Sequence, residues 1–122
     1  MARKFPAATA KAIDAIKYFR IRAGVEHRLI AIWVVVVDGR IFVRPWNDKK
    51  GGWYRAFLED PTGAVEVDDR EIPVRALRVE SEKIFDAVDQ GYAAKYTSKA
   101  NQKYVTGFAT PKRRATTMEL VP

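Results

Sequence analysis

Nine consecutive apolar residues followed by an Asp-Gly pair constrain the fold of this chain more than any other feature. The run reads LIAIWVVVV, from Leu29 to Val37, and Asp38-Gly39 follows it directly. A buried helix is the rival interpretation of such a run. Four successive valines favour a strand, and Asp-Gly is typical of a tight hairpin. The sequence therefore predicts a long strand over 27–38, buried on both faces at its centre.

Five further segments have the alternation or the boundaries of strands. The return strand of the hairpin places Ile41 and Val43 on one face and Arg40, Phe42 and Arg44 on the other. The alternation slips by one residue in the strand after the second hairpin, which predicts a β-bulge there. The five segments are 20–23, 40–44, 64–67, 71–80 and 115–121.

Three helices are predicted between these strands. Thr9 is suited to cap the first, and Ser81 the last, whose apolar stripe runs to Tyr96. A short helix follows Gly52, with Trp53, Phe57 and Leu58 as its apolar face, and residues 107–114 are predicted as a basic loop. Strands in hairpins with flanking helices indicate an α+β fold, a small antiparallel barrel.

Composition narrows the class of protein further. A chain of 122 residues forms one domain, 1–122, and it holds no cysteine and one histidine, so neither disulfides nor a transition-metal site is expected. No apolar run approaches the length of a membrane span, so a cytoplasmic protein without membrane contact is expected. The net charge of +7 comes from scattered residues with two short basic runs, which makes nucleic-acid binding an unlikely function.

The passage after the hairpin is the best candidate for a ligand site. Trp46 begins a loop that continues through Asp48, Lys49, Lys50, Gly51 and Gly52 into the short helix. Glycines allow close approach of the backbone to a phosphate, lysines add charge, and a tryptophan stacks on planar rings. A solvated loop with no ligand is the alternative interpretation.

Several residues beside that loop complete the candidate set. Arg44 is suited to a bidentate phosphate contact, and Arg55 either adds to the phosphate site or pairs with an acid. Trp53 anchors the short helix or contacts the ligand, and Tyr54 is a weak candidate for a catalytic proton donor. The run Lys112-Arg113-Arg114 is a second candidate for anion binding.

The order of these elements resembles a known family. The block IWVVVVDGRIFVRPW, then GGWYRAFLEDPTGAVEVDDREIPVRALRV and the closing ATTMELVP resemble the bacterial family called domain of unknown function 2255, over roughly residues 32–122. That family resembles split-barrel flavin-binding proteins, especially deazaflavin-dependent nitroreductases. The resemblance implies a six-stranded antiparallel split β-barrel of the FMN-binding type, often dimeric, with an isoalloxazine cofactor near a basic loop.

The sequence and the resemblance therefore indicate two possible functions from different classes. The first is a flavin- or deazaflavin-dependent oxidoreductase, similar to nitroreductases, using FMN or a deazaflavin and forming a homodimer. Its predicted cofactor-binding residues are Arg44, Trp46, Lys49, Lys50, Gly51, Gly52, Trp53 and Arg55. The alternative is a non-catalytic split-barrel protein that binds a phosphorylated or anionic ligand.

Overall fold

The structure is a computed structural model that describes residues 4–122. Its strands are β1 Phe19–Ala23, β2 Ile30–Ile32, β3 Val35–Val37, β4 Arg40–Val43, β5 Thr62–Val67, β6 Arg70–Arg78 and β7 Met118–Val121. Its helices are α1 Ala7–Asp14, α2 Trp53–Glu59, α3 Glu82–Lys95, the 3₁₀ turn η1 Lys99–Asn101, α4 Gln102–Phe108 and α5 Pro111–Arg114. The α+β class is confirmed. The count of six strands is wrong, because the strand predicted over 27–38 forms two strands, β2 and β3.

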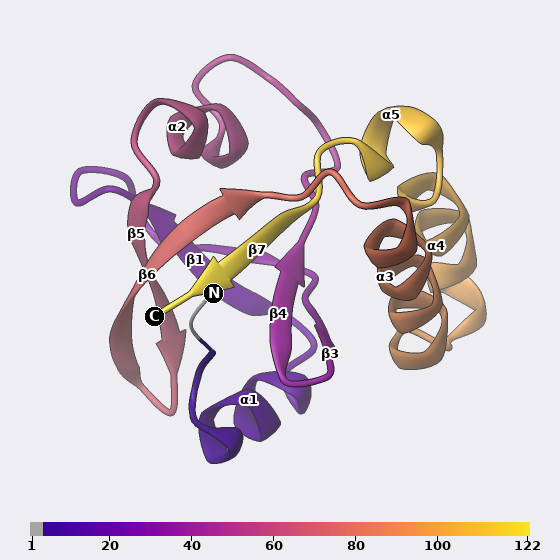
Figure 1. Cartoon of the computed structure of the whole chain (residues 1–122), viewed down its shortest axis with the longest axis horizontal. Helices are drawn as coiled ribbons and strands as arrows, with labels where there is room; N and C mark the ends of the chain where they lie inside the picture. The colour runs from indigo at the N-terminus through magenta and orange to yellow at the C-terminus, as the bar shows by residue number, and fades with distance from the viewer. Residues whose placement is uncertain (1–3) are drawn as a thin grey trace.

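All seven strands belong to one antiparallel sheet, in the order β2-β1-β5-β6-β7-β4-β3. The two ends of this order, β2 and β3, are neighbours in the sequence with only Trp33 and Val34 between them. A flat sheet cannot bring its opposite edges so close. The sheet is therefore curled into a half-barrel, with α2 and α1 at opposite ends and α3, α4 and α5 along one side (Figure 1).

The break at Trp33 and Val34 corrects the prediction of one long strand. The Val34 N–H donates to the Tyr96 hydroxyl at 3.0 Å, and the Val34 carbonyl accepts from Lys95 Nζ at 3.1 Å. Trp33 stacks on the Tyr96 ring, with 3.9 Å between centroids. The backbone at this point is thus bonded to α3 instead of to a strand. The segment is also only partly buried at most positions, because it forms both edges of the sheet.

Both hairpins form where the sequence predicts them, although the second turn, predicted over 68–70, is Asp68-Asp69 alone, because Arg70 already pairs with Val67. Asp38 and Gly39 have φ of 51° and 75°, and Asp68 and Asp69 have φ of 52° and 62°. Positive φ at both central residues defines the tight turn that suits the twist of antiparallel strands. Aspartate and glycine are the residues that adopt this conformation at low cost, which is why the turns were readable from sequence.

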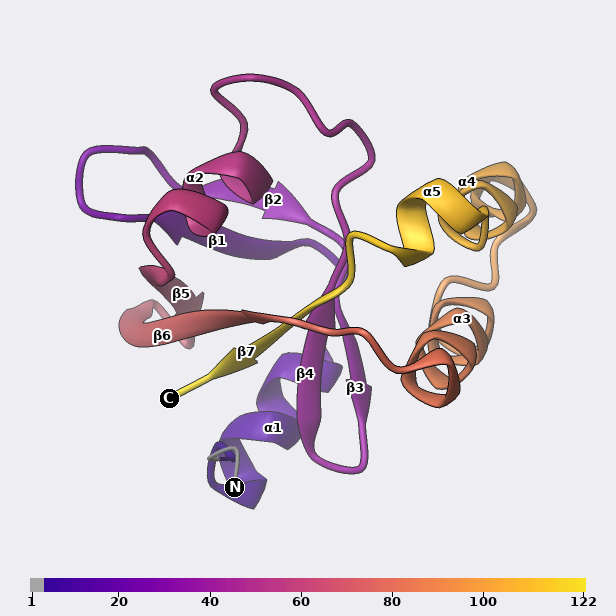
Figure 2. The ribbon, with the colours of Figure 1, turned by 45° about the horizontal axis from the view of Figure 1, so that its top comes forward.

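The predicted β-bulge in β6 is wrong. Pairing of β6 with β7 advances one residue at a time from Arg75 to Arg78, with no extra residue. The slip in the alternation has another cause. Ala76 faces the inside of the half-barrel, Leu77 is 37% exposed, and Val79 is buried against the helices on the outside. The chain leaves the sheet at the end of β6 and runs toward α3 (Figure 2), so its buried side chains change from the inside to the outside of the half-barrel.

Two buried clusters make up the core. The inner cluster fills the half-barrel with side chains from the sheet, α1 and α2, including Ile13, Phe19, Ile41, Val65 and Leu120. The outer cluster lies between the outer face of the sheet and the helices α3 and α4, and it consists of Val35, Phe42, Val79, Phe85, Val88, Tyr92, Tyr96 and Phe108. The strand β4 contributes Ile41 and Val43 to the first and Phe42 to the second, as its alternation predicts.

The helices were predicted less completely than the strands. Ser81 caps α3, accepting from the Ile84 N–H at 3.3 Å, and the α3 stripe is buried as predicted. The Thr9 cap is wrong, since α1 begins after Pro6. Leu58 is exposed, and Tyr54 takes its place in the apolar face of α2. The basic loop predicted over 107–114 is wrong, because it contains the end of α4 and all of α5.

Candidate functional site

An open pocket of about 320 Å³ lies between the break in the β2–β3 segment and the helix α4. We call it the aromatic pocket. Three of its residues, Tyr18, Trp46 and Tyr104, are among the few large apolar side chains that remain exposed within residues 4–122. The lining residues are Tyr18, Ala31, Ile32, Trp33, Arg44, Trp46, Asn101, Tyr104 and Phe108. An open, largely aromatic lining is suited to a flat, apolar ring.

Ring-to-ring packing fixes the wall of this pocket. Tyr104 meets Trp33 and Trp46 edge-on, with centroid distances of 6.0 and 5.1 Å. Phe108 meets Trp46 in the same way at 5.2 Å and stacks on Tyr92 at 4.8 Å. Edge-to-face pairs of this kind are favourable beyond the apolar area that they bury. Trp33 and Trp46 therefore both pack against the α4 side chains Tyr104 and Phe108.

Arg44 forms part of the pocket lining but is almost wholly buried, with 1% exposed. Its Nε donates to the Thr117 hydroxyl at 2.7 Å, and its Nη1 donates to Asp89 at 2.5 Å. Backbone carbonyls of Phe108 and Phe85 accept from Nη1 and Nη2. These contacts use four of the five guanidinium N–H groups. Arg44 thus ties β4 to α3 and α4, and most of its hydrogen-bonding capacity is used within the protein.

A second pocket, of about 350 Å³, lies on the neighbouring surface, and we call it the basic pocket. It brings Lys49 of the predicted loop together with Lys112 and Arg113 of the second basic run. Its one acid, Asp48, is already paired with Arg55 at 2.8 Å. The lining residues are Pro45, Trp46, Asn47, Asp48, Lys49, Thr110, Lys112, Arg113 and Thr116. Three cations against one paired acid make this pocket suited to an anion.

Arg113 lies at the junction of the two pockets. Its guanidinium carbon is 3.7 Å from the centroid of the Trp46 ring, and its Nε donates to the Trp46 carbonyl at 2.9 Å. Its Nη1 donates to the Gly107 carbonyl at 3.2 Å. Gly107 is required here, because a Cβ at this position would lie 2.4 Å from a Trp46 ring carbon. The indole of Trp46, which lines both pockets, is thus held between Arg113 and α4.

The glycines of the predicted loop form a turn. The Gly52 N–H donates to the Lys49 carbonyl at 3.0 Å, and Gly51 adopts φ of 81° between them. Lys50 is exposed at the corner of this turn. Positive φ at the third position is the reason for a glycine there. The Gly52 N–H is therefore occupied by the turn and does not face a ligand, whereas Lys49 faces the basic pocket.

The short helix after the turn supports the loop. Trp53 packs edge-on against Phe57, and Tyr54 is buried with 6% exposed in the inner cluster. Arg55 pairs with Asp48, as one of the two sequence interpretations predicted. Tyr54 and Arg55 are not among the residues that line the aromatic or the basic pocket. Their roles as catalytic or cofactor-binding residues stay predictions.

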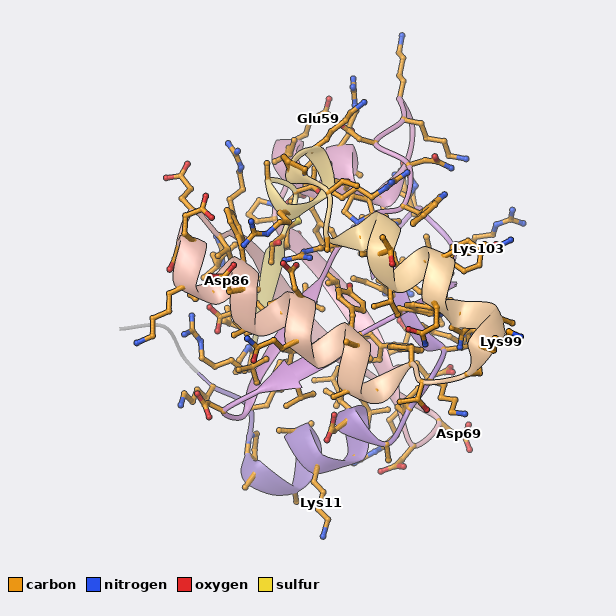
Figure 3. The ribbon with its side chains drawn as sticks, turned by 90° about the vertical axis from the view of Figure 1, so that its right-hand side faces the viewer. Lys11, Glu59, Asp69, Asp86, Lys99 and Lys103 are labelled. Carbon is orange, nitrogen blue, oxygen red and sulfur yellow. The ribbon has the colours of Figure 1, made fainter. Side chains whose placement is uncertain are left out.

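Three lining residues of the aromatic pocket that carry polar groups were not predicted from the sequence. Tyr18 lies just before β1, Asn101 ends η1 and Tyr104 lies on α4. No local motif marks them, and Asn101 and Tyr104 reach the pocket only because η1 and α4 fold back over the sheet edge. Arg114 belongs to the second basic run in the sequence. In the structure it does not line the basic pocket but forms ion pairs with Glu82, Asp86 and Asp89 of α3. Figure 3 looks onto this helical layer, with Asp86 on α3 and Lys103 on α4.

Burial shifts three titratable groups behind the aromatic pocket. It raises the pKa of the Tyr96 hydroxyl to about 12, from an ordinary value of 10.0. Burial also raises the pKa of Tyr92 and lowers the pKa of the Lys95 ammonium. Both tyrosines are therefore neutral at physiological pH, and the Tyr96 hydroxyl accepts from the Val34 N–H and donates to the Lys17 carbonyl.

Two other kinds of site are not found in the described part of the chain. Across residues 4–122, no group of three or more His, Cys, Asp or Glu side chains could hold a metal ion. No helix in the same range has the length and apolar character needed to cross a membrane.

Comparison with known proteins places the chain in a family and a fold. Residues 9–120 match the family described as an uncharacterized protein conserved in bacteria, DUF2255. No curated protein matches the sequence. The crystal structure of conserved hypothetical protein Rv2991 from Mycobacterium tuberculosis is similar, with a TM-score of 0.59 and 16% identity over 98% of this chain and 79% of that one. Identity at this level shows a shared fold alone.

Proposed function

The chain belongs to the bacterial family DUF2255, and from the site that it carries we propose that it binds a planar ligand bearing a phosphate, of the FMN or deazaflavin class. The observation that supports this proposal is that an aromatic pocket and a basic pocket share one side chain, Trp46. A ring in the first pocket and a phosphate in the second would satisfy both linings at once. The sequence resemblance to flavin-binding split barrels points to the same class of ligand.

The residues present fit such a ligand. The aromatic pocket, at about 320 Å³, is at the lower end of the range of roughly 300–1,000 Å³ for small-molecule sites, so it suits one ring system rather than a whole dinucleotide. Trp46 and Tyr104 would contact the ring. Lys49, Lys112 and Arg113 would hold the phosphate, whereas the hydroxyls of Thr110 and Thr116 already donate to the carbonyls of Gly107 and Arg113.

An oxidoreductase is the function that such a ligand would imply. The bound cofactor would supply hydride transfer, and the protein would supply binding, orientation and electrostatics. In the aromatic pocket, Trp33 and Tyr104 would cover one side of the ring and keep water away from it. Tyr18 and Asn101 offer hydrogen-bonding groups among the lining residues, where a substrate would meet the ring.

A binding experiment with matched ligands tests the proposal. FMN and riboflavin differ by one phosphate, so FMN should bind more tightly. Removing a charge-assisted contact costs about 1.5 kcal/mol or more, so Lys49→Ala and Lys112→Ala should each weaken FMN about tenfold. Neither substitution should change the affinity for riboflavin. A deazaflavin phosphate measured alongside FMN would identify the preferred ring.

Lys11→Ala supplies the matched control. Lys11 is an exposed lysine of α1, which lies at the opposite end of the molecule from the 44–52 loop (Figures 1 and 3). It should leave both affinities unchanged, which separates a phosphate site from a general effect of net charge. Equal affinity of FMN and riboflavin, or no saturable binding of either, would reject the proposed ligand class.

The alternative of a non-catalytic anion-binding protein is supported by the basic pocket alone. That pocket is complete without any ring in the aromatic pocket, and its cations come from two separate segments. It predicts saturable binding of inorganic phosphate with no turnover of a reduced cofactor. The predicted homodimer also stays a prediction, to be measured by the molecular mass in solution.

A further inference from the structure

We propose that Arg113 couples the two pockets, so that an anion bound in the basic pocket prepares the aromatic pocket to receive a ring. Arg113 is a positioning residue in this scheme: it acts on the ring through Trp46. The inference rests on the proposed function only in the use of riboflavin as the ring. The effect of inorganic phosphate on Trp46 can be measured without any flavin.

The contacts of Arg113 place it against the side chain that both pockets share. The guanidinium carbon lies over the indole at 3.7 Å from its centroid, and two N–H groups of Arg113 donate to backbone carbonyls, those of Trp46 and Gly107. The other three N–H groups have no partner within residues 4–122. Since Arg113 lines the basic pocket, these are the groups that an anion there would engage.

An anion on those N–H groups would restrict the guanidinium to its stacked position. Arginine presents its donors in a rigid plane, so bonds on one edge of the plane fix the orientation of the whole group. A fixed guanidinium restricts the indole below it, whose other neighbours, Tyr104 and Phe108, are already packed edge-on. The wall that Trp46 gives to the aromatic pocket would then be ordered before the ring binds.

Ordering of this kind appears as cooperativity. A ring that binds to a mobile Trp46 loses the conformational entropy of that side chain. If the anion has already ordered Trp46, the ring binds without this entropic cost, and its affinity rises. Coupling between sites typically amounts to about 5–150-fold in affinity, and it is reciprocal. We expect the low end here, about fivefold, because the indole is already partly held. Saturating phosphate should lower the Kd of riboflavin about fivefold, and saturating riboflavin should lower the Kd of phosphate by the same factor.

Two substitutions separate coupling from charge. Arg113→Lys keeps the positive charge but removes the planar fork and the stacking surface. It should still bind phosphate, while the coupling factor should fall to about one. Lys112→Ala removes a charge from the same pocket without touching Trp46, so it should weaken phosphate but leave the coupling factor at saturation unchanged. Sodium chloride at matched ionic strength controls for screening.

A second measurement does not depend on flavin binding. In a protein carrying Trp33→Phe and Trp53→Phe, Trp46 is the only fluorophore of its kind. Phosphate should reduce the quenching of Trp46 by acrylamide, because the guanidinium becomes fixed over an indole that is 37% exposed. The further change Arg113→Lys should abolish that protection. Circular dichroism and thermal unfolding would confirm that each variant is folded.

The outcomes distinguish the two proposals. Phosphate-dependent protection of Trp46 together with a reciprocal, Arg113-dependent rise in riboflavin affinity would support both. Protection of Trp46 without any flavin binding would reject the proposed cofactor and leave the coupling standing. No effect of phosphate on Trp46 or on the riboflavin Kd would overturn the coupling, whether or not flavin binds.

Discussion

The two faces of the curled sheet are buried by different chemistry. The inner cluster is mainly aliphatic and its side chains come from the strands, α1 and α2, whereas the outer cluster is mainly aromatic and encloses the charged Arg44. Polar atoms in the outer layer hold backbone groups across long separations, as Tyr96 holds Val34. The aromatic pocket opens from this second layer. The candidate site therefore lies where polar contacts and aromatic pairs, rather than aliphatic packing, set the geometry.

The largest expected effect is the loss of Arg44. Arg44→Met should lower the free energy of unfolding by about 3–5 kcal/mol, the cost of breaking a buried ion pair by removing one partner. The substitution also leaves the carbonyls of Phe85 and Phe108 without their donor. Urea unfolding followed by circular dichroism measures the change.

Arg20→Met is the control for that experiment. Arg20 pairs with Glu66 at 2.9 Å on the exposed outer face of β1 and β5, with half of the arginine side chain accessible. A surface pair of this kind contributes about 0–1 kcal/mol. If Arg44→Met cost no more than Arg20→Met, the contrast between the polar outer layer and the rest of the molecule would be lost.

Removal of one oxygen tests the same contrast more finely. Tyr96→Phe should cost about 1–3 kcal/mol, because the Val34 N–H and the Lys17 carbonyl both lose their partner in a buried setting. The variant should also make the backbone at Trp33 and Val34, between β2 and β3, open more often, because it is no longer bonded to the Tyr96 hydroxyl. Amide hydrogen exchange at Val34 would report that opening, and unchanged protection there would contradict the role given to Tyr96.

A volume-conserving change in the inner cluster should cost less. Met118→Leu exchanges one buried apolar side chain for another of similar size, with a cost below about 1.5 kcal/mol. No hydrogen bond is lost at this position. A thermal or urea unfolding series that includes Tyr96→Phe compares the two faces directly. A larger loss for Met118→Leu than for Tyr96→Phe would reverse the comparison.

A dependence of stability on alkaline pH is the effect confined to the narrowest range of conditions. The folded-state pKa of Tyr96 is raised to about 12 from 10.0, so the folded protein holds this proton more tightly than the unfolded chain. The stability that this shift contributes is fully present below pH 10 and is lost as pH rises from 10 to 12. Tyr92 shifts in the same direction, while Lys95 opposes both. Tyr96→Phe should therefore show a shallower loss of urea midpoint between pH 10 and pH 12, and an equal slope would contradict the assignment.

The candidate site was only partly readable from sequence. Lys49 and Trp46 were identified because a basic, glycine-containing loop with a tryptophan has a local signature. Arg44 was selected for the right chemical reason, yet its N–H groups are largely used by carbonyls and a carboxylate brought in from α3 and α4. Tyr104 was missed because α4 is short and carries one buried residue, Phe108, so it has no apolar periodicity to detect.

Local chemistry in the sequence determined the turns, the capped amphipathic α3 and the alternation of β4. Each of these depends on residues a few positions apart, whose backbone preferences and faces act within one element. Tertiary structure alone decided where the long apolar segment breaks, which side chains meet around Trp46, and how Arg113 joins the two pockets. Those outcomes depend on contacts such as that between Tyr96 and Val34, 62 residues apart, and between Arg113 and Trp46, 67 residues apart. Their geometry exists only after the sheet has curled and α4 has packed over its edge.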